Sequence, residues 1–390
     1  MHIGPVLRQQ RLLKGLTVTE AATLGGVTRS YLSMVETAQR APNPELLVPF
    51  TRKLAMPTET WLPAFLADER RCSRLMRLGR ALFASGDYVA ARCALLRALR
   101  VSRESGDARY NSEIHMLLGQ VCYAQGRYPP ALRWFGRLER AIRHGTDKHT
   151  RAVVRYNVAQ CMAKVGQELD ALPRFDEAIA EFGQLGLTFE LGKAWLAKAN
   201  LLLSAKMHRE ARQAYRSAAY YLGGTPHSGD ALLGCAICAR VLDGAKASLP
   251  LLQEIVGISD SDPVLCAKVR VHIAIALREI GRFDEAVAEI DKSLAVRAEL
   301  PSPLAASLLA EATLIHALRH DRAAAVHALS LYKAVQGPRD GQDIAAMRIL
   351  ARVLGAPPPE EELPRVVEEE HEHRLRDALR LLQDGGMREA

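Results

Sequence analysis

Apolar residues recur every three or four positions along most of this 390-residue chain, which is the period of an amphipathic α-helix. The first such stretch covers residues 4–14, and a second begins after Thr17, a favourable cap. A tight turn at Gly25-Gly26 separates the second stretch from a third over residues 28–37. Aromatic residues make up only 5% of a composition rich in Ala, Leu and Arg, which favours helices over strands.

Two further helices complete an amino-terminal bundle. Asn43-Pro44 supplies a favourable cap and first position for a fourth helix, and Pro49 removes one hydrogen bond from its interior. Thr58 is expected to cap a fifth helix that carries Trp61. We therefore expect a five-helix domain over residues 1–66.

From Leu78 onward the sequence repeats itself. A small residue in each unit is followed seven positions later by a turn residue and then by Ala, most clearly in residues 78–91, 118–131 and 273–286. The small residues are Gly79, Gly119, Ala159, Ala199, Cys235, Ala274 and Thr313, at steps of 40, 40, 40, 36, 39 and 39. Regular spacing of this kind predicts stacked helical hairpins.

The pattern as a whole predicts an all-α chain, with the five-helix bundle followed by a right-handed α-solenoid of about seven to eight hairpins. Residues 67–74 form a short charged hinge, and the repeat array covers residues 75–355. An acidic, Pro-rich connector is expected at residues 356–373, followed by a helix and tail at residues 374–390.

The net charge of +8 is unevenly distributed. Residues 1–66 carry seven Lys and Arg against four Asp and Glu, and residues 70–155 carry eighteen against six. Nucleic acid is a natural partner for such a distribution. The alternative is that arginine is the general surface residue of a GC-rich genome, although the acidic second half of the chain argues against it.

The sequence shows no membrane-spanning segment, signal peptide or catalytic motif. No apolar run approaches the roughly 20 residues that cross a bilayer, and the first residues lack a signal pattern, so we expect a cytoplasmic protein. Seven scattered cysteines are expected to be reduced core residues. We find no phosphate-binding Gly loop, HExxH motif or nucleophile elbow, and we expect neither a cofactor nor an enzyme.

Two constellations leave a choice of role. Cys235-x-x-Cys238 could bind a metal or act in redox chemistry, but its apolar helical setting favours packing. His371 and His373 stand in a Glu-rich run, where a solvated linker is favoured over a metal site.

Residues 15–42 resemble the helix-turn-helix of the XRE, or Cro/cI, family of repressors. The resemblance rests on Gly15-Leu16-Thr17, Ala22, the run GVTRSYLS at 26–33, Glu36 and Arg40-x-Pro42. It implies a third helix that enters the major groove of double-stranded DNA, held by an ion pair between Arg11 and Glu36. Base edges would be contacted by Arg29, Ser30, Ser33 and Met34, and phosphates by Thr17, Tyr31 and Arg40, with the cap Thr28 among the DNA-contacting residues.

The chain departs from the family pattern at three positions. Val18 replaces a phosphate-binding Gln, Ala38 replaces the Gly that ends the third helix, and Pro49 interrupts the fourth. The alternative to DNA binding is a degenerate module that only packs against protein.

The repeats resemble tetratricopeptide repeats with longer helices. In that family the residue after the small position points into a concave groove, where amide side chains can bind an extended peptide. The groove residues would be Arg80, Gln120, Gln160 and Asn200, flanked by Tyr123, Tyr156, Asn157, Lys164 and Lys193, and then the apolar Ala236, Ile275 and Leu314. The alternative is that these positions are polar because water fills the groove.

An XRE-type reader joined to tetratricopeptide repeats resembles the bacterial RRNPP regulators, which sense imported signalling peptides. The resemblance implies a homodimeric, quorum-sensing transcription regulator that binds a two-half-site operator and takes a short peptide, or a partner-protein segment, in its groove. Two alternatives stay open. One is a protein-interaction adaptor in which the reader is secondary, and the other is an array that only holds the chain dimeric.

Overall fold

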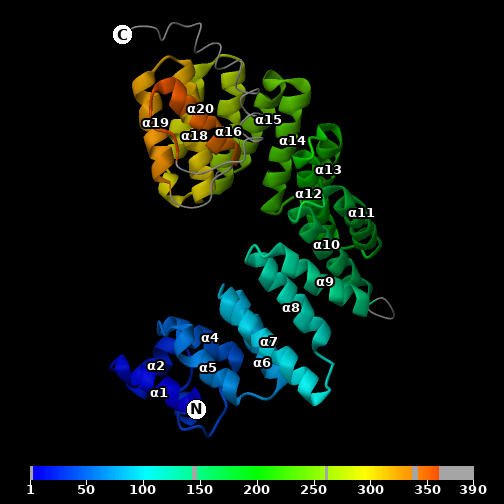
Figure 1. The fold of residues 1–390 in the computed structure, drawn as a ribbon, viewed down its shortest axis with the longest axis vertical. Helices are drawn as coiled ribbons and strands as arrows, with labels where there is room; N and C mark the ends of the chain where they lie inside the picture. The colour runs from blue at the N-terminus through cyan, green and yellow to red at the C-terminus, as the bar shows by residue number, and fades with distance from the viewer. Residues whose placement is uncertain (1–2, 143–146, 260–261, 336–340, 360–390) are drawn as a thin grey trace. The chain divides into compact units, whose positions relative to one another are not determined.

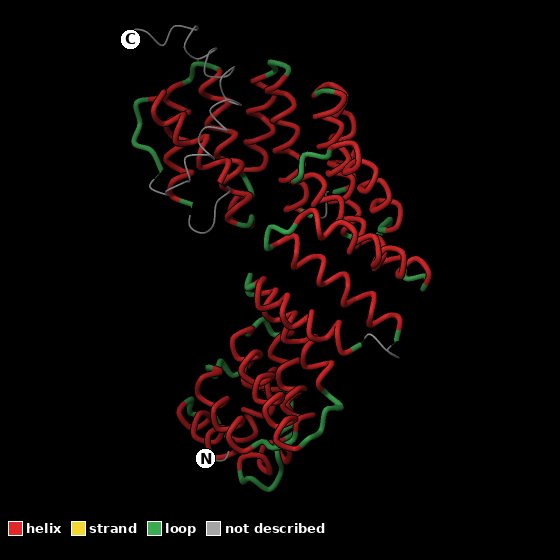
Figure 2. The backbone as a smooth tube through the Cα atoms, turned by 45° about the vertical axis from the view of Figure 1, so that its right-hand side comes forward, coloured by secondary structure: helices red, strands yellow, loops and turns green. Residues whose placement is uncertain are grey.

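A computed structural model describes residues 3–142, 147–259, 262–335 and 341–359, which form helices and connecting loops (Figure 2). The chain divides into two compact units, Met1–Leu187 and Thr188–Ala390. The first unit holds the amino-terminal bundle and three helical hairpins, and the second holds the rest of the array. The all-α fold predicted from the sequence, a bundle followed by repeated hairpins, is therefore confirmed.

Five short helices form the amino-terminal bundle (Figure 1). They are α1 (Ile3–Leu13), α2 (Val18–Gly25), α3 (Arg29–Glu36), α4 (Pro44–Lys53) and α5 (Thr58–Asp68). The side-chain oxygen of Thr17 accepts from the backbone N–H of Glu20, and the Glu20 carboxylate accepts from the N–H of Thr17, which completes a capping box for α2. Gly26 then takes a left-handed conformation with φ 73°, so the chain can reverse directly into α3.

Close contact between α1 and α3 depends on a glycine. A Cβ on Gly4 would lie 2.2 Å from the backbone oxygen of Val35, so only glycine allows the two helices to approach this closely. Leu32, Val35 and Trp61 are almost fully buried in the shared core. The inward face of α3 is thereby fixed, and its opposite face is left toward solvent.

The prediction that Thr58 caps α5 is wrong. Pro57 occupies the N-cap without a side-chain hydrogen bond, and Thr58 is the first helical residue. The extended backbone of Pro57, with φ −59° and ψ 137°, starts the helix one residue earlier than a hydroxyl cap would. Thr60 then donates its hydroxyl to the Pro57 carbonyl at 2.7 Å.

Three helical hairpins complete the first unit (Figure 1). They pair α6 (Cys72–Ala84) with α7 (Tyr88–Ser105), α8 (Asn111–Ala124) with α9 (Tyr128–Ala141), and α10 (Lys148–Lys164) with α11 (Glu168–Gln184). Each hairpin turns at a glycine with positive φ two residues beyond its first helix, namely Gly86, Gly126 and Gly166. Gly119 allows α8 and α9 to touch, because a Cβ there would lie 2.4 Å from the Phe135 ring.

The second unit repeats this arrangement. Its pairs are α12 (Thr188–Ser204) with α13 (His208–Tyr221), α14 (His227–Asp243) with α15 (Ala245–Ile258), α16 (Pro263–Glu279) with α17 (Phe283–Leu294), and α18 (Ser302–Leu318) with α19 (Arg322–Ala334); a 3-10 turn, η1 (Arg297–Glu299), precedes α18, and α20 (Gly341–Leu354) follows α19. Lys206 and His320 take the turn position with φ 61° and 62°, in a conformation that usually favours glycine. This substitution explains why the repeat is harder to recognise there.

The prediction that Cys235 is the small contact residue of its repeat is wrong by one position. Cys235 is only half-buried, whereas Gly234 is buried, and a Cβ on Gly234 would lie 2.3 Å from the Tyr215 ring. Gly234 is therefore the small contact residue of α14. The expected groove residue of this repeat is then Cys235, and Ala236, which is fully buried, does not face a groove.

The acidic connector expected at 356–373 lies outside the described residues except for 356–359, and the helix and tail expected at 374–390 lie wholly outside them. Of the helices that the structure describes, none combines the length and apolar character needed to span a membrane.

Candidate functional site

Helix α3 presents a polar face to solvent. Thr28 caps it, since its side-chain oxygen accepts from the backbone N–H of Tyr31 at 3.2 Å. Leu32 and Val35, each 2% exposed, turn into the bundle. Of the residues expected to face base edges, Arg29, Ser30 and Ser33 are exposed and Met34 is half-buried. The cap Thr28 is exposed as well. This face offers one guanidinium and three hydroxyls within a turn and a half of the helix start.

A buried ion pair holds α3 against α1. Arg11 donates from Nε and Nη2 to the two carboxylate oxygens of Glu36, at 2.7 and 2.8 Å. Arg11 Nη1 also donates to the Leu16 carbonyl at 2.6 Å, and the bond to Glu36 raises the Arg11 pKa. The pair that the family resemblance implies is thus present, and it fixes the carboxyl end of the helix that carries the polar face.

The residues expected to contact phosphates differ in whether their polar groups remain available to bind an anion. The Arg40 guanidinium lies over the Tyr31 ring, 5.3 Å from its centroid. The Tyr31 hydroxyl accepts from the Asn43 backbone N–H at 2.8 Å, which leaves its proton to donate. Thr17 is committed to the capping box of α2, because its hydroxyl also donates to Glu20 at 2.7 Å. Arg40 and Tyr31 are therefore better placed for an anion than Thr17.

The stretch expected as a hinge, residues 67–74, contains few non-helical residues. α5 ends at Asp68 and α6 begins at Cys72. The Arg74 guanidinium pairs with Glu69 and donates to the Pro42 carbonyl in the loop before α4. α4 also packs against α6. The amino-terminal bundle is therefore fastened to the first hairpin by side-chain contacts as well as by the connecting chain.

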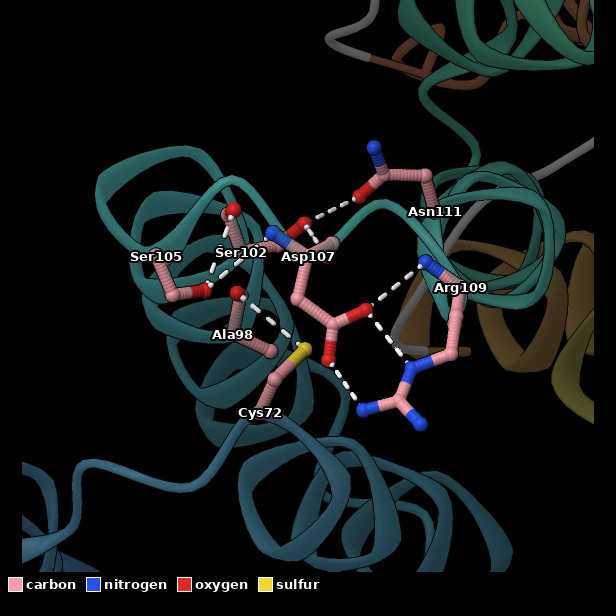
Figure 3. A network of polar contacts seen from close by, with 7 residues as sticks. All are labelled: Cys72, Ala98, Ser102, Ser105, Asp107, Arg109 and Asn111. Atoms are coloured by element: carbon pink, nitrogen blue, oxygen red, sulfur yellow. Dashed lines mark hydrogen bonds and ion pairs between the residues drawn. The ribbon is translucent and has the colours of Figure 1, made fainter.

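A polar network orders the loop between α7 and α8 (Figure 3). Ser102 donates to the Asp107 carbonyl, and Asp107 pairs with Arg109 through Nε at 2.9 Å and Nη2 at 2.8 Å. The hydrogen bonds from Arg109 lower the Asp107 pKa to about 2. The Cys72 thiol, at the start of α6, donates to the Ala98 carbonyl. Ser102 Oγ also lies 2.6 Å from Oδ1 of Asn111, the first residue of α8. The network therefore holds the start of α8 against α7, and Cys72 links α6 to α7.

The ligand residues expected in the first unit divide into free and engaged groups. The side chains of Arg80 and Lys164 are exposed, although Arg80 pairs with Glu113 of α8. Gln120 is half-buried, and Tyr123 stacks edge-on against Tyr128 with ring centroids 5.3 Å apart.

A second group of expected ligand residues lies on α10. Gln160 donates to the Tyr156 hydroxyl at 2.7 Å, and Asn157 donates to the Met116 sulfur at 3.6 Å. Tyr156 packs against Phe175 and Phe182, and burial raises its pKa. Tyr156 is therefore a packing residue that orients the Gln160 amide.

The remaining two expected ligand residues lie in the second unit. Asn200 is exposed, and its Oδ1 accepts from the Tyr215 hydroxyl at 2.7 Å. The Lys193 ammonium lies 5.6 Å from the centroid of the Phe189 ring. Gln160 and Asn200 thus share one feature, an amide oriented by a tyrosine hydroxyl.

Cys235 and Cys238 both lie on α14. Cys238 is buried, Cys235 is half-buried, and burial raises the pKa of Cys235 to about 11 and also raises that of Cys238. Thiols that stay protonated are poor nucleophiles and poor metal ligands. Within the described residues, no three His, Cys, Asp or Glu side chains are grouped to hold a metal. His371 and His373 lie outside those residues.

Two family models match the chain. Residues 7–60 match a helix-turn-helix family and residues 71–144 match a tetratricopeptide-repeat family. No curated protein matches the sequence significantly. The two matched regions coincide with the amino-terminal bundle and with the first two hairpins.

Solved structures of low sequence identity share the fold of the array. A tetratricopeptide-repeat protein from Parabacteroides merdae is 16% identical with a TM-score of 0.54, covering 73% of this chain and 97% of its own. The apo form of RapI is 13% identical with a TM-score of 0.52, covering 72% of this chain and 99% of its own.

The chain therefore contains a helix-turn-helix region, matched over residues 7–60, and tetratricopeptide repeats, matched over residues 71–144. This is the domain combination for which the sequence resembles the RRNPP regulators. Neither matched family is a family of enzymes.

Proposed function

We propose that this protein is a sequence-specific DNA-binding transcription regulator whose repeat array senses a short signalling peptide. The observation that carries the proposal is the exposed first turn of α3, with Arg29, Ser30 and Ser33 outward while Leu32 and Val35 anchor the helix. A helix held in this way can enter the major groove with its amino-terminal residues against base edges.

Each outward residue has a chemical role at DNA. The Arg29 guanidinium can donate two hydrogen bonds to the O6 and N7 of a guanine, which is the commonest specific contact in the major groove. Ser30 and Ser33 can donate to or accept from neighbouring bases. Arg40 and Tyr31 would contact phosphates, which sets the register of the helix on the duplex.

The sensing role is supported by the polar residues of the first helices of the hairpins. Gln160 and Asn200 present amides oriented by Tyr156 and Tyr215, and an amide can both donate to and accept from a peptide backbone. The peptide would act by binding one arrangement of a cytoplasmic homodimer better than another. The two DNA-reading bundles would then fit, or fail to fit, two half-sites of an operator.

DNA retention at several salt concentrations tests the proposal. We expect a duplex from the protein's own locus to bind at least about a thousandfold more tightly than an unrelated duplex, with affinity that falls steeply as salt rises. A protein-interaction adaptor would show neither behaviour, so equal and weak retention of all duplexes would overturn the proposal. Alanine at both Gln160 and Asn200 should remove any peptide response while DNA retention persists.

A further inference from the structure

A cavity of about 520 Å³ lies where the DNA-reading bundle meets the first hairpin. One wall is the face of α4 at positions 45, 48, 49 and 52. The other is the face of α6 at positions 77, 80, 81 and 84, together with Ser85, which follows the helix. Both sets follow the three-and-four spacing of a single helix face. The volume is within the roughly 300–1,000 Å³ range of small-molecule sites.

The floor of this junction cavity is apolar. Val48 and Pro49 of α4 face Ala81 and Ala84 of α6, and both Pro49 and Ala84 are exposed to the cavity and solvent. Pro49 lacks an N–H, so the carbonyl of Glu45, four residues earlier, loses its usual donor in the helix. Pro49, which weakens α4 as a helix, thus supplies a rigid apolar surface to the cavity.

The rim of the junction cavity is cationic. Arg77 makes no hydrogen bond or ion pair to any residue that the structure describes. Arg80 is exposed and pairs with Glu113, and Arg52 reaches the Ser85 carbonyl at 3.4 Å. Three guanidinium groups therefore surround a lining that contains one carboxylate, Glu45.

We propose that the junction cavity binds a carboxylate attached to an apolar group, namely the free carboxyl terminus of the sensed peptide together with its apolar last side chain. The inference rests on the proposed peptide sensing, because Arg80 is also the first residue of the predicted ligand groove. Arg77 would bind the carboxylate, and the apolar group would cover Pro49 and Ala84. A guanidinium binds a carboxylate through two parallel hydrogen bonds, which an amide end cannot accept.

This location gives the ligand a direct route to the DNA-reading bundle. A bound carboxylate terminus would touch α4 of the bundle and α6 of the array at the same time. Its affinity would then depend on how these two helices are spaced, and their spacing would depend on the ligand. Coupling of this kind needs no relay through the later repeats.

Two matched pairs of probes test the proposal on the full-length protein by titration calorimetry. One pair is N-acetyl-leucyl-leucine and its carboxamide, and the other is octanoate and octanamide. We expect N-acetyl-leucyl-leucine to bind about tenfold or more tightly than its carboxamide. Preference confined to the peptide pair assigns a peptide terminus, and preference in the octanoate pair alone overturns that assignment in favour of a free fatty acid.

Two variants with matched controls locate the site. Ala84→Phe should fill the cavity and abolish binding, whereas Ala124→Phe, at the equivalent exposed position of α8, should leave it unchanged. Arg77→Gln should remove the preference for acid over amide, whereas Arg100→Gln, an exposed arginine outside the cavity, should keep it.

Equal binding of acids and amides, or equal loss in Ala84→Phe and Ala124→Phe, would overturn the proposal. Retention of the operator duplex by the same preparations is measured in parallel. Acid binding without operator retention would contradict the proposed DNA regulation but would leave the cavity assignment standing. Operator retention without a preference for the acid would contradict the cavity assignment but would leave the DNA regulation standing.

Discussion

Arg11 and Glu36 join the first and third helices of the bundle through two hydrogen bonds of 2.7 and 2.8 Å, with each residue about 5% exposed. Glu36 is the last residue of α3, so the pair sets the angle at which the polar first turn leaves the bundle. Since both charges are buried, water does not take the place of either partner when that partner is removed. The pair is thus both a structural lock and a determinant of how α3 is presented.

Glu36→Leu should destabilise the bundle by about 3–5 kcal/mol, because it leaves the Arg11 charge buried and unpaired. The double variant Arg11→Met with Glu36→Leu should recover most of that loss, since neither charge remains. Hydrogen exchange of the amides in α1 and α3 measures the effect locally. If both variants exchange at the wild-type rate, the pair does not stabilise the bundle.

Arg29→Ala should weaken binding to the preferred operator by about 1–3 kcal/mol and reduce discrimination at one base pair. Non-specific binding should change far less, because base contacts set specificity and phosphate contacts set general affinity. Fluorescence anisotropy with matched and mutated duplexes measures both quantities. Arg216→Ala, an exposed arginine on α13 of the array, serves as the control for loss of one positive charge. An equal loss on every duplex would place Arg29 on a phosphate.

Local signals in the sequence were sufficient to predict the elements of both domains. Thr17 and Gly26 define α2 by capping chemistry that needs no distant contact. Gly79 and Gly119 mark the hairpins because a small residue must stand where two helices touch. Where the small residue was less distinct, at Cys235, the prediction was off by one residue, because Gly234 beside it makes the contact with Tyr215.

The contacts between domains could not be predicted from the sequence. The link from Arg74 to the Pro42 carbonyl spans 32 positions and involves a backbone acceptor, which leaves no trace in a residue pattern. Pro49 could be recognised only as a break in helix hydrogen bonding, and its exposed place in a cavity depends on how α4 packs on α6. Likewise, the partner of Gln160 could not be foreseen, although Tyr156 stands four residues before it.

Gly119→Ala should destabilise the second hairpin by about 1–3 kcal/mol, because the new Cβ would overlap the Phe135 ring and force α8 and α9 apart. Gly136→Ala on α9 is the matched control. A Cβ at Gly136 meets no described atom within 4 Å, so alanine there should stabilise the helix by about 0.5–1 kcal/mol. Denaturant unfolding of both variants measures the two signs, and a loss in Gly136→Ala equal to that in Gly119→Ala would contradict the packing explanation.

A titrating histidine should make the second unit less stable in mild acid. Burial, with Arg240 nearby, lowers the pKa of His272 from 6.5 to about 4. His272 lines a cavity together with Lys268 and Glu311, and Arg240 itself pairs with Glu279. Between pH 6.5 and about 4 the unfolded chain therefore binds a proton that the folded chain does not, so the free energy of unfolding falls as the pH falls through this window.

The His272→Gln variant isolates this contribution. Of the stability that the wild type loses between pH 7 and pH 4.5, about 1–3 kcal/mol should be absent in the variant. His115 and His316, whose pKa values burial also lowers, are present in both proteins and cancel in the comparison. Urea unfolding of the two proteins at both pH values supplies the four free energies. If the wild type and His272→Gln lose equal stability, His272 is as free to take up a proton in the folded chain as in the unfolded one, and it does not couple stability to pH.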